Sequence, residues 1–366
     1  MKPRYVGIYH YSIPFVRPVP VRGHSLGTRD GLVLALTAGD RSHTGFGEIA
    51  PLEGLHEETL SEALEQCKAV LPVADLSCGT LSLADAGKNL PGNLFPSVQT
   101  GVEMALLNLQ ATAGRSSPSF PGASVPARKL PVNALLFGDT TSVLAMADDY
   151  FHQGYRTFKL KVQAADPGLA VEQVLSLRST FGDEISLRLD SNRSFLLEDA
   201  CTFFSRIPAA ANIEYIEEPV ADPLLIPEFF SRTGIRSALD ESLWMSPGIW
   251  HEIPHDCLGG VVLKPSRLGS FSNTLRVALE AEAVEIPAVI STAYETGISL
   301  GFYTRLASVI SEEPAPCGLD TFRQLSRDIL TEQFHTETGY LLPESVYHNS
   351  LYPDLSRLKL IESWTL

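Results

Sequence analysis

Short apolar runs alternate with amphipathic segments along most of the chain beyond residue 130. Each run has the length of a buried strand, and the intervening segments carry apolar residues at helical spacing. The runs start roughly 25 residues apart, the length of one strand–helix–loop unit. This pattern predicts strands at residues 132–137, 157–162, 185–190, 213–217, 237–240, 260–264 and 288–291, with a shorter one near Cys317.

About eight such units in succession favour a TIM-type barrel over an open doubly wound sheet. An open sheet of this kind usually carries a glycine-rich phosphate turn near its start. The chain contains neither a G-x-G-x-x-G motif nor a Walker motif. The expected fold class is therefore α/β, with a modified TIM barrel at residues 126–320 that carries the active site.

The part of the chain before the barrel has an α+β pattern. Residues 6–15 and 31–37 are expected to form strands, and residues 57–71 and 97–113 to form helices. Residues 114–130 are rich in Ser, Pro and Gly, which is typical of a domain boundary. We expect a capping domain and a C-terminal segment that packs back on it, with these bounds: residues 1–125 and residues 321–366.

The amino-acid composition argues against some classes of binding partner. The 366 residues include 28 basic and 43 acidic ones, a formal net charge of −15 that repels nucleic acids and anionic lipid surfaces. We therefore expect a small-molecule partner, with no nucleic acid and no membrane. The N-terminus lacks the apolar core of a signal peptide, and the five cysteines form no C-x-x-C pair. These features predict a cytoplasmic protein without a zinc site.

Charged residues close the apolar runs of five consecutive predicted strands. Barrel active sites form at the carboxyl ends of the strands. These positions are held by Lys161, Asp190, Glu217, Asp240 and Lys264, spaced 23 to 29 residues apart. Because burial of an unpaired ion is costly, one charge per barrel unit indicates a shared site at the mouth of the barrel.

The types of charge indicate metal-assisted proton abstraction. Asp190, Glu217 and Asp240 would repel one another without a hard cation, and such oxygen ligands suit Mg²⁺, with Mn²⁺ as the alternative. Strand alternation places Lys159 and Lys161 on the same inward face. A lysine next to another cation has a lowered pKa and acts as a base near neutrality. A base, a second cation and a Lewis acid together suit removal of a proton next to a carboxylate.

Each motif taken alone has a simpler interpretation. Glu217 and Glu218 would also suit the start of a helix, and Asp240 with its neighbours would suit an N-cap. Two facing acids also fit glycoside hydrolysis, but that function leaves the lysines and the third acid unexplained. A non-catalytic barrel used for binding has no reason to retain costly buried charges. Five strands in register argue against all of these alternatives together.

The charged strand ends lie in segments that resemble the enolase superfamily, in its muconate lactonizing enzyme subgroup. These segments are KLK at 159–161, RLDSNRSF at 188–195, IEEP at 216–219, ALDES at 238–242 and VVLKPSRLGS at 261–270. The resemblance extends over most of the chain and includes TRDGLVLAL at 28–36, GFGEIAPLEGL at 45–55, VISTAYETGISLG at 289–301 and GLDT at 318–321. The resemblance implies a (β/α)7β barrel under an α+β capping domain that the C-terminal segment completes.

Within the subgroup, the chain is most similar to the lyases of menaquinone biosynthesis that dehydrate 2-succinyl-6-hydroxy-2,4-cyclohexadiene-1-carboxylate to 2-succinylbenzoate. The resemblance implies that Lys161 removes the α proton and then, as an acid, assists loss of the hydroxyl. Lys264 would stabilise the enediolate from the opposite side, and Lys159 would hold down the pKa of Lys161 and approach the carboxylate. The implied metal ligands are Asp190, Glu217 and Asp240, with Glu218 as the nearest rival of Glu217.

The resemblance also implies substrate contacts. Besides Lys159, these are Arg188, Asn192, Ser291 and Thr292, together with Arg22 in a mobile capping loop at residues 21–30. Racemisation of an N-succinylamino acid, or another epimerisation of the same subgroup, is the main alternative because it needs only two opposed lysines. Dipeptide epimerases have an Asp-x-Asp motif at the eighth strand. Here Gly318 replaces the first acid, which counts against that activity.

Overall fold

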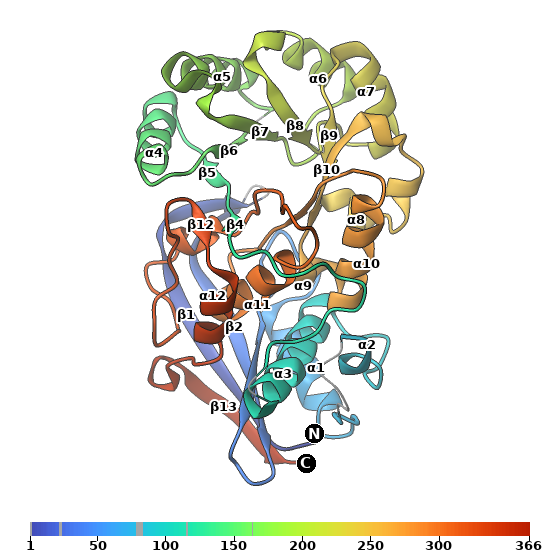
Figure 1. Cartoon of the computed structure of the whole chain (residues 1–366), viewed down its shortest axis with the longest axis vertical. Coiled ribbons are helices and arrows are strands. Elements are labelled where there is room, and N and C mark those ends of the chain that lie inside the picture. The colour runs from blue at the N-terminus through green and yellow to red at the C-terminus, as the bar shows by residue number, and fades with distance from the viewer. Residues whose placement is uncertain (1, 22–23, 78–82, 115, 163) are drawn as a thin grey trace.

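Two sheets, one antiparallel and one parallel, lie at opposite ends of an elongated molecule (Figure 1). The computed structural model describes residues 2–21, 24–77, 83–114, 116–162 and 164–366. Helices lie around the parallel sheet, whereas the first and last strands of the chain meet in the antiparallel sheet. None of the helices in these ranges is long and apolar enough to cross a membrane.

The antiparallel sheet has the strand order β13-β1-β2-β3. Its strands are β1 (Pro3–Val21), β2 (His24–Ala38), β3 (Thr44–Ile49) and β13 (Lys359–Thr365). Apolar side chains from one face of this sheet pack against two helices, α1 (Leu60–Val70) and α3 (Pro96–Gly114). The strand from the end of the chain thus pairs with the strand from its beginning.

The capping loop expected at residues 21–30 overlaps the paired ends of β1 and β2, residues 19–21 and 24–26, which we call the tip of the β1–β2 hairpin. Residues 24–30 belong to β2 and pair with β1, for example Leu26 with Val19. The expectation of a loop is wrong there because the ladder between β1 and β2 resumes after an irregularity in its register. Arg22, the substrate contact expected in this segment, lies outside the described residues.

Two glycines allow helix α3 to approach the antiparallel sheet closely. A Cβ atom on Gly45 would lie 2.1 Å from the backbone oxygen of Ala105, and one on Gly47 would lie 1.9 Å from that of Gly101. Any larger residue would push the helix off strand β3. The close contact fixes α3 between the antiparallel sheet and the barrel, where it is buried along most of its length.

Seven parallel strands form the barrel, in the order β11-β10-β9-β8-β7-β6-β5. They are β5 (Ala134–Leu136), β6 (Thr157–Lys161), β7 (Ser186–Asp190), β8 (Ile213–Glu217), β9 (Ser237–Leu239), β10 (Leu258–Leu263) and β11 (Ala288–Ile290). Single parallel bridges from Cys317 to Val132 and from Gly318 to Ser291 connect the two edges of this sheet. The run expected near Cys317 therefore closes the barrel. In the described part of the chain it does so through these two single bridges and not as an extended strand.

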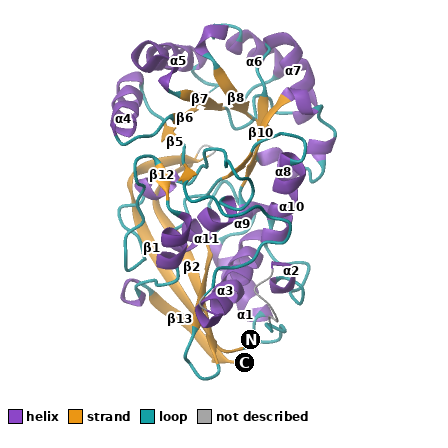
Figure 2. Cartoon of the chain, viewed as in Figure 1, coloured by secondary structure: helices purple, strands orange, loops and turns teal. Residues whose placement is uncertain are grey.

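Helices cover the outside of the barrel and fill the connections between its strands (Figure 2). They are α4 (Thr140–His152), α5 (Pro167–Phe181), α6 (Leu197–Phe204), α7 (Ile226–Thr233), α8 (Glu241–Met245), α9 (Pro265–Leu268), α10 (Phe271–Glu282) and α11 (Gly297–Ala307). Smaller elements are α2 (Leu83–Ala86), α12 (Pro343–Ser350), β4 (Leu130–Pro131) and β12 (Tyr340–Leu341). The expected TIM-like barrel with an α+β cap is confirmed.

Buried polar contacts join the antiparallel sheet to the barrel. The carboxylate of Glu48, on β3, accepts hydrogen bonds from the backbone N–H groups of Thr296 (2.9 Å) and Ser299 (3.2 Å), at the start of α11. This carboxylate therefore serves as the N-terminal cap of a barrel helix. Arg29, on β2, donates to the backbone carbonyl of Tyr294 (3.0 Å). Both contacts hold the capping sheet against the mouth of the barrel.

Candidate active site

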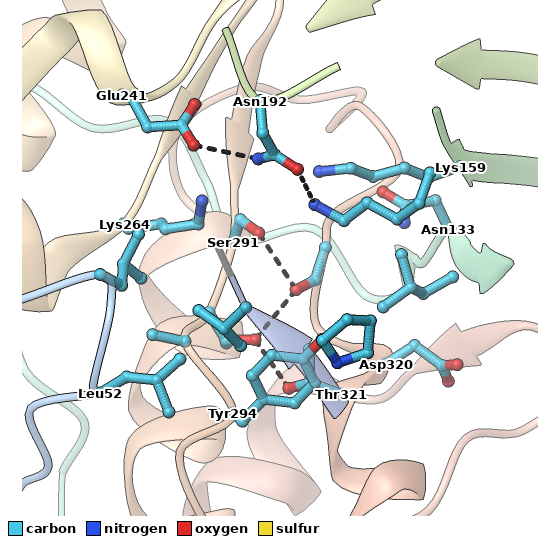
Figure 3. Close-up of a pocket in the computed structure, with 18 residues that line it drawn as sticks. Leu52, Asn133, Lys159, Asn192, Glu241, Lys264, Ser291, Tyr294, Asp320 and Thr321 are labelled. Carbon is cyan, nitrogen blue, oxygen red and sulfur yellow. Dashed lines mark hydrogen bonds between the residues drawn. The ribbon is translucent and has the colours of Figure 1, made fainter. Parts of the chain in front are cut away.

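A pocket opens at the carboxyl ends of the barrel strands, beneath the tip of the β1–β2 hairpin. It has about 750 Å³ of space, including its open mouth. Figure 3 shows Lys264 and Lys159 on opposite sides of this space. The β1–β2 hairpin and the loop after β3 contribute an apolar wall. Its residues are Pro20, Val21, Leu52 and Leu55. The position agrees with the site expected at the strand ends.

Six charged side chains form what we call the lysine–carboxylate cluster. Its members are Lys159, Lys161, Asp190, Glu217, Asp240 and Lys264. They come from the ends of five consecutive strands, because parallel strands in a barrel bring their carboxyl ends to one face. The structure thus brings together the two catalytic lysines and the three metal ligands expected from the sequence.

Lys159 lies at the bottom of the cluster and bridges two acids. Its Nζ lies 2.9 Å from Oδ2 of Asp190 and also donates a hydrogen bond to Oε2 of Glu217. Burial favours the neutral amine, but the surrounding carboxylates prevail and raise the pKa of Lys159 well above its ordinary value. Lys159 therefore remains a fixed positive charge at the base of the pocket.

Lys161 lies nearer to the pocket and is the more exposed of the two lysines on β6, with 28% of its side chain accessible. Its Nζ donates to Oδ2 of Asp190 (2.6 Å) and to Oδ1 of Asn192 (2.7 Å). Burial would raise the pKa of Asp190, but Lys159 and Lys161 together lower it far below its ordinary value. Asp190 is therefore ionised and accepts hydrogen bonds from both lysines.

Lys264 approaches from the end of β10. Its Nζ donates to Oδ2 of Asp240 and lies 5.3 Å from the centre of the Trp244 ring. Burial acts to lower the pKa of Lys264, but Asp240 and Glu241 raise it. Lys264 is therefore charged, as the stabiliser of a developing negative charge must be.

Unusual backbone angles occur at the ends of three strands around the pocket. Asn192, Glu218 and Tyr294 have positive φ angles of 45°, 46° and 61°. Such angles are costly for residues other than glycine and persist where the surroundings enforce them. We infer that the strained backbone at these three residues sets the direction of the side chains at the ends of the strands.

The surroundings of Glu218 decide between it and Glu217 as the acid of the cluster. The carboxylate of Glu218 accepts hydrogen bonds from the backbone N–H groups of Asp240 and Ser242, both at 2.8 Å, and from the Ser242 hydroxyl at 2.7 Å. Glu218 therefore fixes the turn after β9. Glu217 instead accepts a hydrogen bond from Lys159.

The three acids of the cluster have the chemistry of a site for a hard cation. Burial and then the neighbouring charges of Asp190 and Asp240 raise the pKa of Glu217 to about 7, against the opposing effect of Lys159. Oδ1 of Asp240 is buried and has no hydrogen-bond partner among the residues that the structure describes. Carboxylate oxygens with excess negative charge fit a divalent cation. In the described ranges no three acidic, histidine or cysteine side chains are arranged around one ion, and lysine side chains lie against the oxygens of Asp190 and Asp240.

Arg188 lies elsewhere than expected. Its buried guanidinium donates to Glu214 at 3.0 and 2.8 Å and to the carbonyl of Pro316 at 2.6 Å, and it covers the Tyr215 ring. It does not line the pocket. Residue 188 lies two positions before Asp190 on the same face of β7, which places it about 7 Å deeper in the barrel. The structure therefore corrects the expected substrate contact to a core ion pair.

Of the other expected substrate contacts, Asn192, Ser291 and Thr292 line the pocket. The hydroxyl of Thr292 lies 2.7 Å from that of Thr321 and 3.2 Å from the carbonyl of Gly318. Several further residues line the pocket but were not expected there from the sequence: Asn133, Glu241, Tyr294, Asp320 and Thr321. Each lies near an end of a predicted barrel strand. This position is the feature of the sequence that could have identified these residues as part of the pocket.

Comparison with protein-family models gives two matches. Residues 142–346 match the model described as "Enolase C-terminal domain-like", and residues 3–109 match "MenC, N-terminal domain". The o-succinylbenzoate synthases of Pasteurella multocida and Aliivibrio fischeri (strain MJ11) are 30% and 32% identical to the chain. These matches cover 88% and 86% of this chain, and 90% and 89% of those proteins.

A longer relative and two solved structures extend this comparison. The chain is 31% identical to Arabidopsis thaliana "Protein PHYLLO, chloroplastic" over 90% of its own length, but it spans 21% of that protein. An N-succinyl Arg/Lys racemase from Bacillus cereus has a similar fold, with a TM-score of 0.79 and 16% identity over both whole chains. An enolase superfamily member from Roseovarius nubinhibens, complexed with magnesium, has a TM-score of 0.81 and 19% identity, also over both whole chains.

Proposed function

The chain belongs to the o-succinylbenzoate synthase family of the enolase superfamily, and on this premise we propose that it is a lyase of menaquinone biosynthesis. It removes water from 2-succinyl-6-hydroxy-2,4-cyclohexadiene-1-carboxylate and releases 2-succinylbenzoate. The observation that carries this proposal is a pair of lysines, Lys161 and Lys264, that line one pocket from the ends of β6 and β10, four places apart in the order of the barrel strands, with three buried acids next to them.

Lys161 is the base and then the acid in this proposal. As a neutral amine it takes the proton from the ring carbon that bears the carboxylate, and the electron pair of the C–H bond moves into that carboxylate. The C–O bond to the ring hydroxyl then breaks while the Lys161 ammonium returns the proton, so that water leaves. Aromatisation of the ring drives the reaction, and the chain mainly has to position one base and neutralise the enediolate.

Lys264 and Lys159 supply charge on the two sides of the substrate. Lys264 lies across the pocket from Lys159 (Figure 3); it stabilises the enediolate oxygens, and Lys159 attracts the substrate carboxylate from the other side. The raised pKa values of both lysines keep them protonated while Lys161 exchanges its proton.

Asp190, Glu217 and Asp240 are the proposed ligands of a divalent ion, for which we propose Mg²⁺ with Mn²⁺ as the alternative. When bound, the ion supplies Lewis-acid stabilisation to the carboxylate of the substrate. The buried, unpartnered oxygen of Asp240 and the raised pKa of Glu217 support this assignment.

The hairpin tip and the loop that follows β3 close the pocket from the side of the cap. Val21, Leu52 and Leu55 contribute apolar surface there. Such a wall excludes water from the reacting ring, which favours elimination over quenching of the enediolate. The succinyl side chain of the substrate extends toward Ser291 and Thr292, whose hydroxyls line the pocket.

Paired assays of the purified protein test the proposal. One follows aromatisation of the cyclohexadiene substrate by ultraviolet absorbance with Mg²⁺ and after removal of metal by EDTA. The other follows racemisation of N-succinylamino acids by polarimetry, because the same opposed lysines also suit that reaction. We expect fast, metal-dependent dehydration. Racemisation without dehydration would overturn the proposed substrate and leave the lysine pair in use for the alternative reaction.

A further inference from the structure

A hydrogen-bonded chain connects the start of helix α8 to Lys161. The buried carboxylate of Glu241 accepts a hydrogen bond from Nδ2 of Asn192 at 3.0 Å, and Oδ1 of Asn192 accepts one from Nζ of Lys161 at 2.7 Å. Figure 3 shows Glu241 and Asn192 side by side at the rim of the pocket. Three elements, α8, the β7 end and β6, thus meet at one amine.

The amide of Asn192 has one donor end and one acceptor end, and Glu241 determines which end faces Lys161. A carboxylate accepts hydrogen bonds and cannot donate them when ionised. It therefore binds the NH₂ end of the amide and leaves the carbonyl oxygen directed at Nζ. The opposite orientation of the amide would place two N–H groups against Lys161 and a carbonyl against Glu241.

The direction of the amide fixes the direction of the lone pair of the base. A neutral amine has two N–H bonds and one lone pair. With Oδ2 of Asp190 (2.6 Å) and Oδ1 of Asn192 (2.7 Å) accepting both N–H bonds of Lys161, the lone pair is confined to the one remaining direction, on a side chain that lines the pocket. Without a fixed acceptor at Asn192, the amine rotates about its last C–N bond.

The backbone on both sides of Glu241 is held firmly. Glu218 accepts hydrogen bonds from the N–H groups of Asp240 and Ser242, the neighbours of Glu241 in the chain. Asn192 is held as well, since its own N–H donates to Oδ1 of Asp190 at 3.0 Å. Both partners of the amide contact are therefore pre-organised before substrate arrives.

We propose that Glu241 is a positioning residue for the base: acting through the amide of Asn192, it aims the lone pair of Lys161 at the α proton of the substrate. This inference deepens the proposed function and rests on it. It assigns to Glu241 a role distinct from that of Asp240, its neighbour, which we place among the metal ligands.

Steady-state kinetics of four variants test the role. We expect Glu241→Ala to lower kcat about 10- to 100-fold with little change in KM, since a misaligned base costs rate and not binding. Glu241→Gln keeps a carbonyl acceptor for Asn192 and should recover kcat to within about threefold of the wild type. Asn192→Gly suits the φ of 45° at that position and should lose as much as Glu241→Ala. Glu198→Ala, which removes an exposed glutamate on α6, is the control with unchanged kcat.

Non-additivity gives the sharper test. If Glu241 acts through Asn192, the double variant Glu241→Ala/Asn192→Gly has the same kcat as Asn192→Gly alone. Multiplied losses, a Glu241→Gln enzyme as slow as Glu241→Ala, or wild-type kcat in Glu241→Ala would each overturn the proposal. Mg²⁺ affinity, measured by calorimetry, should be unchanged in Glu241→Ala. A parallel loss of Mg²⁺ binding would assign the effect to Asp240 and also overturn it.

A crystal structure of Glu241→Ala separates this proposal from the proposed function. We expect the Asn192 amide to turn and the contact between its Oδ1 and Nζ of Lys161 to be lost. A retained contact would overturn the positioning role whether or not the wild-type protein dehydrates the substrate. A wild-type protein without dehydratase activity would overturn the proposed function, which the paired assays detect separately.

Discussion

Two clusters of buried charge differ in what satisfies them. At the boundary between cap and barrel, the side chains of Tyr11, Arg29, Glu48 and Glu295 form a cluster that we call the clamp. Backbone groups satisfy most of the clamp: Arg29 donates to the carbonyls of Tyr294, Pro51, Ala50 and Asp30, and Glu48 accepts from two backbone N–H groups of α11. In the lysine–carboxylate cluster the charges mainly satisfy one another.

The difference separates structural from functional burial of charge. Backbone dipoles are fixed in place by the fold, so a charge bound to them holds one geometry and stabilises it. Ion pairs between side chains exchange partners, so the cluster admits a substrate carboxylate or a metal ion without unfolding. We therefore expect substitutions in the clamp to change stability and substitutions in the cluster to change activity.

The largest effect should follow from removal of the base. Lys161→Ala should lower dehydration at least 10³-fold, because general acid–base catalysis of this kind contributes about 10²–10⁴-fold and Lys161 acts twice. The fold should stay intact, since Asp190 keeps its contact with Lys159. Aromatisation kinetics and thermal unfolding measure the two halves of this prediction. An enzyme with a tenth of its activity left would contradict the assignment of the base.

In the clamp, Arg29→Met should have the opposite effect: a large loss of stability and a small change in activity. The variant keeps the apolar stem but leaves buried carbonyls without a donor, which should lower the free energy of unfolding by about 3–5 kcal/mol. Denaturant unfolding measures the loss, and kcat of the folded fraction should change only a few fold. Arg232→Met, which breaks an exposed ion pair with Glu198, is the control and should cost less than about 1 kcal/mol. Equal losses in both variants would remove the distinction between the two clusters.

The metal site gives an intermediate effect. Asp190→Asn should weaken Mg²⁺ binding about 10- to 100-fold, because it removes one charged ligand while the backbone stays in place. Isothermal titration calorimetry at neutral pH measures this change. Unchanged affinity would contradict the role of Asp190 and of the triad as a whole.

A buried acid outside both clusters sharpens the comparison because its hydrogen-bond partners are neutral. Glu103, on α3, accepts hydrogen bonds from the backbone N–H of Phe271 and the amide of Gln99, but burial outweighs both and raises its pKa to about 7. The folded protein then binds the proton more tightly than the unfolded chain, so stability falls as pH rises from about 4.5 to about 7 and is level above.

Glu103→Gln should remove this slope. At pH 8 the variant should be more stable than the wild type by about 1 kcal/mol or more, whereas at pH 4.5 the two should be equal. Thermal unfolding at both pH values is the measurement. A variant that is less stable than the wild type at pH 8 would show that the Glu103 carboxylate is stabilising when ionised.

Much of the barrel was predictable from its apolar runs. The runs expected at 157–162, 185–190 and 213–217 correspond to β6, β7 and β8 within one residue at each end. Each run is buried on both faces and ends in a charge, so pattern and chemistry indicate the same boundary. The cap was less predictable, because the long β1–β2 ladder depends on pairing between strands and its exposed end lacks an apolar pattern.

The active site, too, has a part that was predictable from the sequence and a part that was not. Strand ends located the lysine–carboxylate cluster, because each member closes its own run. The depth of Arg188 and the role of Glu241 depend on partners far away in the sequence, Pro316 for the first and Asn192 for the second. No local pattern specifies such contacts. The clamp was missed for this reason too, since Arg29 and Glu48 meet the barrel through its backbone.

The pairing of β13 with β1 has a consequence for synthesis on the ribosome. Tyr5 and Thr365 are partners in the ladder although 360 residues separate them. At typical translation rates, β1 therefore waits roughly 20–70 s for its partner. During that time its edge offers unpaired backbone groups to any other extended chain. The nascent protein is thus most exposed to aggregation at the sheet it makes first, and a chaperone that shields this edge would raise the yield of folded enzyme.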